Sequence, residues 1–258
     1  MSFITGNKFK ESCNFILDEN GFRVNKKTPT NQIPVFFVKT DLLSLFFSKF
    51  KPNVKYKLVT HNSDIHLSEK ILEFIDDTNL VSWFGQNTMI EHPKLKSIPI
   101  GVANNIWPHG DESKLQKVIS ENNEKNKLIY CSFDVSTNLS ERTKCLYFMK
   151  INNLDMETKL PFEDYLRNLS KSFFSLSPNG NGVDCHKLWE SLYLKTIPIV
   201  TSSVNIQFYK NLPILVIPSW SEFDVSTLTI ELYQNLIKKL NYKNLELEYY
   251  LNLIKLSK

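Results

Sequence analysis

The segment from Ser175 to Val200, SLSPNGNGVDCHKLWESLYLKTIPIV, constrains the fold more than any other part of the chain. The 258 residues include only seven glycines, and Gly180 and Gly182 stand two apart within this segment. An apolar run, 173–176, precedes them, and an amphipathic stretch and a second apolar run, 197–200, follow. This order predicts a strand, a glycine loop, a helix and a buried strand.

Such a loop has two interpretations. Glycines let the backbone approach a ligand closely, and the start of a helix offers free N–H groups to an anion. Pro-Asn-Gly-Asn-Gly is also ordinary turn sequence, and it is neither a Walker loop nor the dinucleotide fingerprint. Lys187 and Glu190, three residues apart on the predicted helix, favour binding. A cation there can meet phosphate, and a carboxylate can accept hydrogen bonds from a ribose diol.

The segment resembles the donor-binding segment of exostosin-like glycosyltransferases and their viral and bacterial relatives. That segment is an apolar strand, Pro-x-Gly, a basic residue three before a Glu, and a small apolar strand with Ile-Pro. The matching positions are Pro178, Gly180, Lys187, Glu190 and Ile197-Pro198. The chain departs from the family at Lys187, where an Arg usually makes a bidentate phosphate contact.

The resemblance implies a GT-B-type glycosyltransferase: two Rossmann-like α/β domains facing a cleft. It also implies a nucleotide-diphosphate sugar as donor, a UDP-sugar, and transfer with inversion to a glycan or other hydroxyl acceptor by a hexosyl- or pentosyltransferase. No cofactor is expected besides this donor. The expected donor-binding residues are Ser136, Asn138, Arg142, Pro178, Asn179, Gly180, Asn181, Gly182, Asp184, His186, Lys187 and Glu190.

Strand and helix patterns alternate along the chain, which predicts parallel sheets flanked by helices. Strands are expected at 34–38, 56–60, 80–84, 98–101, 128–133, 173–176, 197–200 and 214–217. Helices are expected at 42–50, 67–75, 141–151, 162–169, 226–240 and 245–256, and in the amphipathic segment after the glycine loop. The hydrophilic stretch 120–127 predicts a linker between an acceptor-side domain, 1–122, and a nucleotide-sugar domain, 123–258. A single larger α/β domain is the alternative, and 1–30 carry no assignable pattern.

The polar cluster Thr60-His61-Asn62-Ser63-Asp64 follows an apolar strand directly. Glycosyl transfer with inversion needs a base to take the proton of the acceptor hydroxyl, and either His61 or Asp64 has the required chemistry. Asn62 would contact the acceptor. The cluster can also be read as a loop that caps the following helix.

A third polar stretch, residues 101–110, follows the strand expected at 98–101. Asn104, Trp107 and His109 are its candidates for acceptor binding, since a tryptophan face fits a sugar ring. A packed loop without ligand is the other interpretation.

Bulk composition excludes several classes of protein. The net charge of +4 comes from scattered basic residues, which disfavours nucleic-acid binding. The N-terminus lacks a signal-peptide pattern, no apolar run reaches the length of a membrane span, and the four cysteines form no Cys-x-x-Cys pair, so we expect free thiols and a cytoplasmic location. Neither Asp-x-Asp nor a histidine ligand pattern occurs, so no protein-held metal is expected. A carbohydrate- or nucleotide-binding module without catalysis remains the alternative function.

Overall fold

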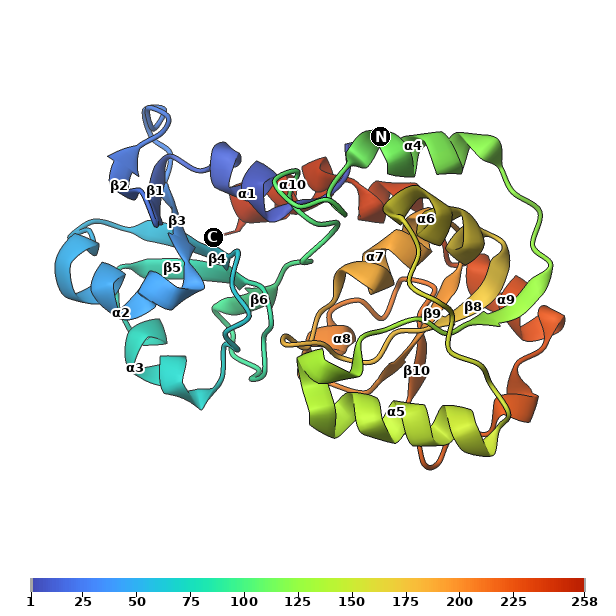
Figure 1. Ribbon diagram of the computed structural model, residues 1–258. Coiled ribbons are helices and arrows are strands. Elements are labelled where there is room, and N and C mark those ends of the chain that lie inside the picture. Colours follow the sequence, from blue (N-terminus) through green and yellow to red (C-terminus); the bar gives the residue numbers. More distant parts are fainter. Residues whose placement is uncertain (1, 258) are drawn as a thin grey trace. The chain divides into compact units, whose positions relative to one another are not determined.

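The computed structural model describes residues 2–257, which form two α/β units (Figure 1). The first unit comprises residues 2–100 and 246–257, and the second comprises 101–245. Each unit has its own sheet, mixed in the first and parallel in the second, and its own hydrophobic core. The α/β class predicted from the alternation of strands and helices is confirmed.

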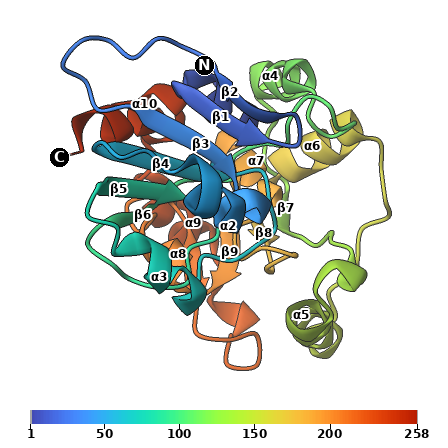
Figure 2. The same ribbon diagram turned by 90° about the vertical axis from the view of Figure 1, so that its left-hand side faces the viewer.

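The first unit is built on a six-stranded sheet in the order β2-β1-β3-β4-β5-β6. Only the pair β1–β2 is antiparallel, and β1, β3, β4 and β5 lie side by side (Figure 2). The strands are β1 (Phe15–Asp18), β2 (Gly21–Val24), β3 (Val35–Lys39), β4 (Tyr56–His61), β5 (Leu80–Gly85) and β6 (Leu95–Ser97). The helices are α1 (Gly6–Ser12), α2 (Leu43–Leu45), α3 (Leu72–Ile75) and α10 (Leu247–Leu256).

Strand β4 is buried along its whole length, so helices cover both faces of the sheet. Tyr56 and Leu58 point to one face, where they join the core formed with α2 and α3. Lys57 points to the other face, where its ammonium group donates to the carbonyls of Ile254 and Lys255 at 2.8 and 2.9 Å. These carbonyls end α10, so a buried cation meets the negative end of the helix dipole.

The second unit contains a four-stranded parallel sheet in the order β10-β9-β8-β7. Its strands are β7 (Lys127–Tyr130), β8 (Ser172–Leu176), β9 (Ile197–Thr201) and β10 (Leu215–Ile217). Its helices are α4 (Glu112–Glu121), α5 (Leu139–Ile151), α6 (Phe162–Ser170), α7 (His186–Tyr193), α8 (Val204–Gln207) and α9 (Ile230–Ile237). Apolar side chains of α5 and α9 form the core on one face of the sheet, and α6 and α7 cover the other (Figure 1).

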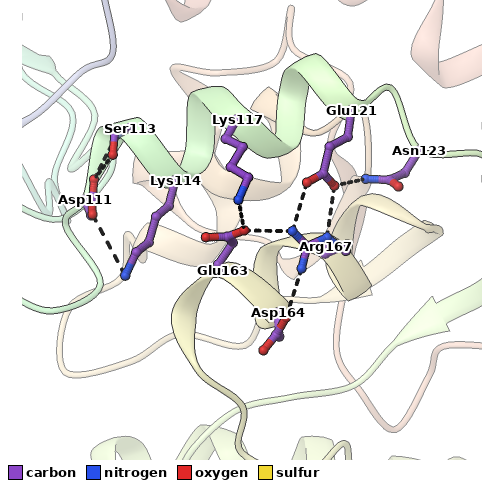
Figure 3. A network of polar contacts seen from close by, with 9 residues as sticks. All are labelled: Asp111, Ser113, Lys114, Lys117, Glu121, Asn123, Glu163, Asp164 and Arg167. Atoms are coloured by element: carbon purple, nitrogen blue, oxygen red, sulfur yellow. Dashed lines mark hydrogen bonds and ion pairs between the residues drawn. The ribbon is translucent and has the colours of Figure 1, made fainter.

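The division between the units differs from the predicted boundary at 122/123. The first unit ends at Ile100, and α4 belongs to the second unit because it packs against α6. A network of ion pairs joins these two helices (Figure 3), with Glu121 of α4 bound to Arg167 of α6 at 2.9 Å. The hydrophilic stretch 120–127 therefore connects α4 to β7 inside one unit. Helix α10 lies more than a hundred residues from the rest of the first unit in sequence, and no local pattern reveals where it packs.

The structure differs from the predicted elements in several places. The strand expected at 98–101 is wrong: the strand here is β6, and Gly101 has a left-handed φ of 68° that a strand does not allow. The helix expected from residue 226 begins at Ile230, because the Thr229 side chain caps the N–H of Leu232. The unassigned region 1–30 contains α1, β1 and β2. Among residues 2–257, no helix has the length and apolar character needed to cross a membrane.

Candidate functional site

The candidate site lies at the carboxyl edge of the sheet in the second unit. Strands β7, β8 and β9 are parallel, so the loops that follow them leave the same edge. Helices α6 and α7 each lead back to the amino end of the next strand, so both begin at this carboxyl edge. The predicted strand, glycine loop, helix and strand correspond to β8, the loop 177–185, α7 and β9, as expected from the sequence.

Two side chains of the neighbouring segment 138–142 hold the glycine loop. Arg142 donates from Nε to the carbonyl of Asn179 at 3.0 Å and from Nη1 to the carbonyl of Asp134 at 2.6 Å. Asn138 donates from Nδ2 to the carbonyl of Gly180 at 2.8 Å. A Cβ atom at Gly180 would lie 3.0 Å from Nη2 of Arg142, so glycine gives the guanidinium room there. Two predicted donor-binding residues thus fix the loop's shape.

Lys187 occupies the first turn of α7 and reaches the end of β7. Its ammonium group donates to the carbonyl of Ser132 at 2.8 Å and lies 5.1 Å from the ring centroid of Tyr130. Burial lowers the pKa of Lys187 to about 8, since the charged form loses hydration. Lys187 is therefore a desolvated cation placed where the loops of β7 and β8 meet.

Glu190 lies one turn further along α7 and is 3% exposed. Its Oε2 accepts a 2.6 Å hydrogen bond from the hydroxyl of Tyr165 on α6. Burial raises the pKa of Glu190 to about 7, while Tyr165 and Lys187 oppose this rise. Within residues 2–257 the other carboxylate oxygen has no hydrogen-bond partner, so it can accept a hydrogen bond from a ligand.

The remaining predicted donor-binding residues have varied surroundings. Asp184 is buried and accepts from the indole N–H of Trp189 at 2.8 Å. His186 begins α7, and its Nδ1 lies 2.8 Å from the carbonyl of Gly101. Ser136 is exposed, and its hydroxyl donates to Asp134 at 2.7 Å. Pro178 and Gly182 are buried, and Asn181 is exposed.

The loop 101–110 belongs to the second unit, although the sequence placed it on the acceptor-side domain. Gly110 makes its path possible, because a Cβ atom there would lie 2.0 Å from the carbonyl oxygen of Asn104. The His109 ring lies 6.2 Å from the His186 ring and stacks with Trp107 at 6.3 Å. Trp107 is 55% exposed, so more than half of this side chain remains accessible beside His109.

The predicted base cluster lies at the carboxyl end of β4 in the first unit. His61 is 2% exposed, its Nε2 lies 3.0 Å from the carbonyl of Pro99, and its Nδ1 accepts from the backbone N–H of Asn62 at 2.7 Å. Both ring nitrogens are thus bonded inside the unit, whereas Asp64 is exposed. The two candidates for the base therefore differ in their access to solvent.

Sequence reasoning missed several residues around these clusters. Gly6 begins α1 against His61, and a Cβ atom there would lie 2.4 Å from the ring Nδ1. Asn7 on α1 accepts at Oδ1 a 3.1 Å hydrogen bond from Nδ2 of Asn62, the predicted acceptor residue, which has a left-handed φ of 58°. In the second unit, Tyr165 and Tyr130 were missed. No local motif marks any of these, because their roles depend on contacts distant in sequence.

No group of three or more His, Cys, Asp or Glu side chains that could hold a metal ion occurs in the part of the chain that the structure describes. The positive groups at the glycine loop, Lys187 and Arg142, are the ones that could meet an anion.

No protein-family model matches the chain, and the search of curated proteins found no match. Among solved structures, a UDP-forming alpha,alpha-trehalose-phosphate synthase from Burkholderia xenovorans is similar, with 11% identity and a TM-score of 0.46 over 86% of this chain and 72% of that one. An alpha1,3-fucosyltransferase with GDP is similar with 11% identity and a TM-score of 0.35, over 91% and 72%. At this level neither similarity identifies a substrate.

Proposed function

We propose that this protein is a glycosyltransferase that uses a nucleotide-diphosphate sugar, a UDP-sugar in the first instance. The observation that carries the proposal is a pair of side chains on α7 at the carboxyl edge of a parallel sheet: Lys187, which is partly buried, and Glu190, which is buried. A desolvated cation and a desolvated carboxylate three residues apart fit a ligand with an anionic end and a diol.

In the proposed complex, the diphosphate lies at the glycine loop and the start of α7. Lys187 neutralises its charge, and the positive end of the α7 dipole adds to the attraction. Arg142 holds the loop through Asn179 and contributes positive charge. Transfer then needs no metal ion, because protein groups supply the charge that a divalent cation supplies elsewhere.

Glu190 binds the ribose in this proposal. Its Oε2 already accepts a hydrogen bond from Tyr165, and the opposite oxygen accepts from a ribose hydroxyl. The reaction inverts the anomeric carbon by direct displacement, in which an acceptor hydroxyl attacks while a base takes its proton. Asp64 is the better candidate for this base, since it is exposed at a strand end whereas both ring nitrogens of His61 are bonded.

The burial of His61 favours a second candidate function. If Asp64 is also not a base, the nucleotide site remains complete and the protein is a non-catalytic carbohydrate- or nucleotide-binding module. Donor binding without turnover over a broad panel of acceptors identifies this case.

Thermal unfolding with UDP, GDP, ADP and CDP tests the proposed site. A nucleotide that binds only the folded protein raises the midpoint of unfolding. Glu190→Ala should weaken binding by about 1–3 kcal/mol, the range for a hydrogen bond to a charged group. Glu222→Ala, the same change at an exposed loop position, should leave binding unchanged. Because Glu190→Ala also removes the partner of Tyr165, the ligand-induced shift is compared, not the midpoint itself. Unchanged affinity in a folded Glu190→Ala protein would refute the site.

A further inference from the structure

Aromatic side chains adjoin the buried carboxylate on the side of α6. Tyr165, which binds Glu190, stacks with Phe162 at a centroid distance of 6.1 Å and an interplanar angle of 19°. It also meets the Tyr130 ring edge-on at 5.8 Å. Phe162 and Tyr165 are three residues apart and so share one face of the first turn of α6.

These contacts give the site a definite order. Lys187 and then Glu190 follow the glycine loop along α7, and Tyr165 leads from Glu190 to Phe162 on α6, while the Tyr130 ring lies between Lys187 and Tyr165. A nucleoside diphosphate has the same order of groups: an anionic diphosphate, a ribose with two hydroxyls, and a flat base. With the diphosphate at the loop and the ribose at Glu190, the base reaches the aromatic turn of α6.

One polar atom in the cluster lacks a hydrogen bond of ordinary geometry. The Tyr130 hydroxyl is buried and has no such partner within residues 2–257, although the Ser132 side chain is near enough to lower its pKa. Burial without a partner is costly, and a ligand that brings a polar group to this hydroxyl removes the cost. A ribose or base edge supplies such a group.

The ion-pair network between α4 and α6 fixes the aromatic turn (Figure 3). Glu163, the neighbour of Phe162, accepts from Lys117 of α4 at 2.7 Å and from Arg167 at 2.8 Å. Arg167 in turn binds Glu121 of α4. Single exposed ion pairs stabilise little, but this network ties both turns of α6 to α4 and so sets the position of Phe162.

We propose that the first turn of α6 is the nucleobase end of the site, where Phe162 stacks on the base and Tyr165 is a positioning residue that orients Glu190 toward the ribose. The inference rests on the proposed function and adds the part of the donor that α6 recognises. The flat face of the Phe162 ring can stack on any base, so the first turn of α6 contributes affinity for all nucleotides. Groups that contact the edge of the base distinguish one base from another.

Isothermal titration with UDP, GDP, ADP, CDP and inorganic pyrophosphate tests the stacking residue. Phe162→Ala should lower the affinity for the nucleoside diphosphates by roughly ten- to hundredfold, the range for loss of a base–aromatic stack. The affinity for pyrophosphate should stay unchanged. Phe162→Trp should retain affinity. Tyr147→Ala, which removes an exposed aromatic ring from α5, should change nothing.

Tyr165→Phe tests the positioning role through a pH profile. The hydrogen bond from Tyr165 lowers the pKa of Glu190. Without this bond, the affinity for UDP-glucose should begin to rise at a higher pH than in the wild type. A residue that only packs would leave this pH unchanged. One outcome separates the two proposals: nucleotides bind the wild type, and Glu190→Ala lowers their affinity but Phe162→Ala does not. In that case the inference about α6 is wrong while the proposed function stands. The inference is also wrong if Phe162→Ala lowers the affinity for pyrophosphate as much as that for UDP, or if none of these ligands binds the wild type.

Discussion

At the scale of single residues, the site depends on two ionisable groups with displaced pKa values. Burial raises the pKa of Glu190 to about 7 and lowers that of Lys187 to about 8. In water a carboxylate and an ammonium are both charged over a wide range of pH. Here the state in which both groups are charged, which the proposed donor needs, is confined to a narrow range near neutrality.

The affinity for UDP-glucose should therefore be greatest between about pH 7 and about pH 8. As the pH falls below the pKa of Glu190, the carboxylate takes a proton and accepts fewer hydrogen bonds from the ribose. As the pH rises above the pKa of Lys187, the ammonium loses the charge that meets the diphosphate. UDP-glucose is chosen because its diphosphate does not titrate near neutrality.

Titration calorimetry at constant ionic strength measures this profile. Glu190→Gln keeps the shape of the side chain but cannot ionise, so it should abolish the fall below pH 7 and keep the fall on the alkaline side. An acid limb that persists in Glu190→Gln would assign it to another group.

At the scale of elements, the glycine loop is held by the segment that follows β7. Asn138 caps α5 by accepting from the N–H of Glu141, and the same side chain donates to the carbonyl of Gly180. The start of α5 and the loop before α7 are thus one assembly, although about forty residues separate them in sequence. A change in Arg142 should alter both.

Arg142→Ala should lower the free energy of unfolding by about 1–3 kcal/mol, because the part-buried carbonyl of Asn179 and the exposed carbonyl of Asp134 lose a charged donor. Gly180→Ala should destabilise the protein by pressing a methyl group against the guanidinium at Nη2. In the Arg142→Ala background the guanidinium is gone, so Gly180→Ala should cost less. Urea unfolding of both single variants and the double variant measures this coupling, with exposed Lys144→Ala on the same helix as the control. Additive effects would show that the two residues do not interact.

At the scale of the whole molecule, the chain leaves the first unit at Ile100, builds the second, and returns with α10. The returning helix packs on α1 and is fixed by Lys57, and Ser257 meets Ser82 at 2.9 Å. The first unit is therefore built from two segments that are far apart in sequence, 2–100 and 246–257. In our proposal the first unit binds the acceptor and carries the base, and the second unit binds the donor.

Turnover tests this division of roles. Asp64→Asn should lower the transfer rate by roughly 10²–10⁴-fold, the range for loss of a general base, and leave UDP affinity nearly unchanged. His61→Ala should act instead through the stability of the first unit, since it removes a buried ring. Full activity in both variants would remove the cluster from the mechanism and direct attention to His109.

We also expect transfer to continue without a divalent metal ion, so the assays are run in EDTA. Activity that disappears in EDTA and returns with manganese would contradict metal-independent transfer.

The sequence alone determined the elements that depend on local patterning. Buried strands such as 56–60 and 80–84 were predictable because an apolar run in a parallel sheet needs no knowledge of its partner. The order strand, glycine loop, helix and strand was predictable for the same reason, and so was the spacing of Lys187 and Glu190 on one helix. Short elements, such as those in residues 1–30, span too few residues for a local pattern to identify them.

Only the tertiary structure decided which residues meet at these elements. It placed Tyr165 on Glu190 and Arg142 on the carbonyl of Asn179. It assigned residues 101–122 to the second unit and α10 to the first. It also buried His61, whose polar neighbourhood had suggested a base. The physical reason is common to all of these: periodicity fixes which face of an element is apolar, whereas packing between distant segments fixes what that face contacts and which polar groups lose water.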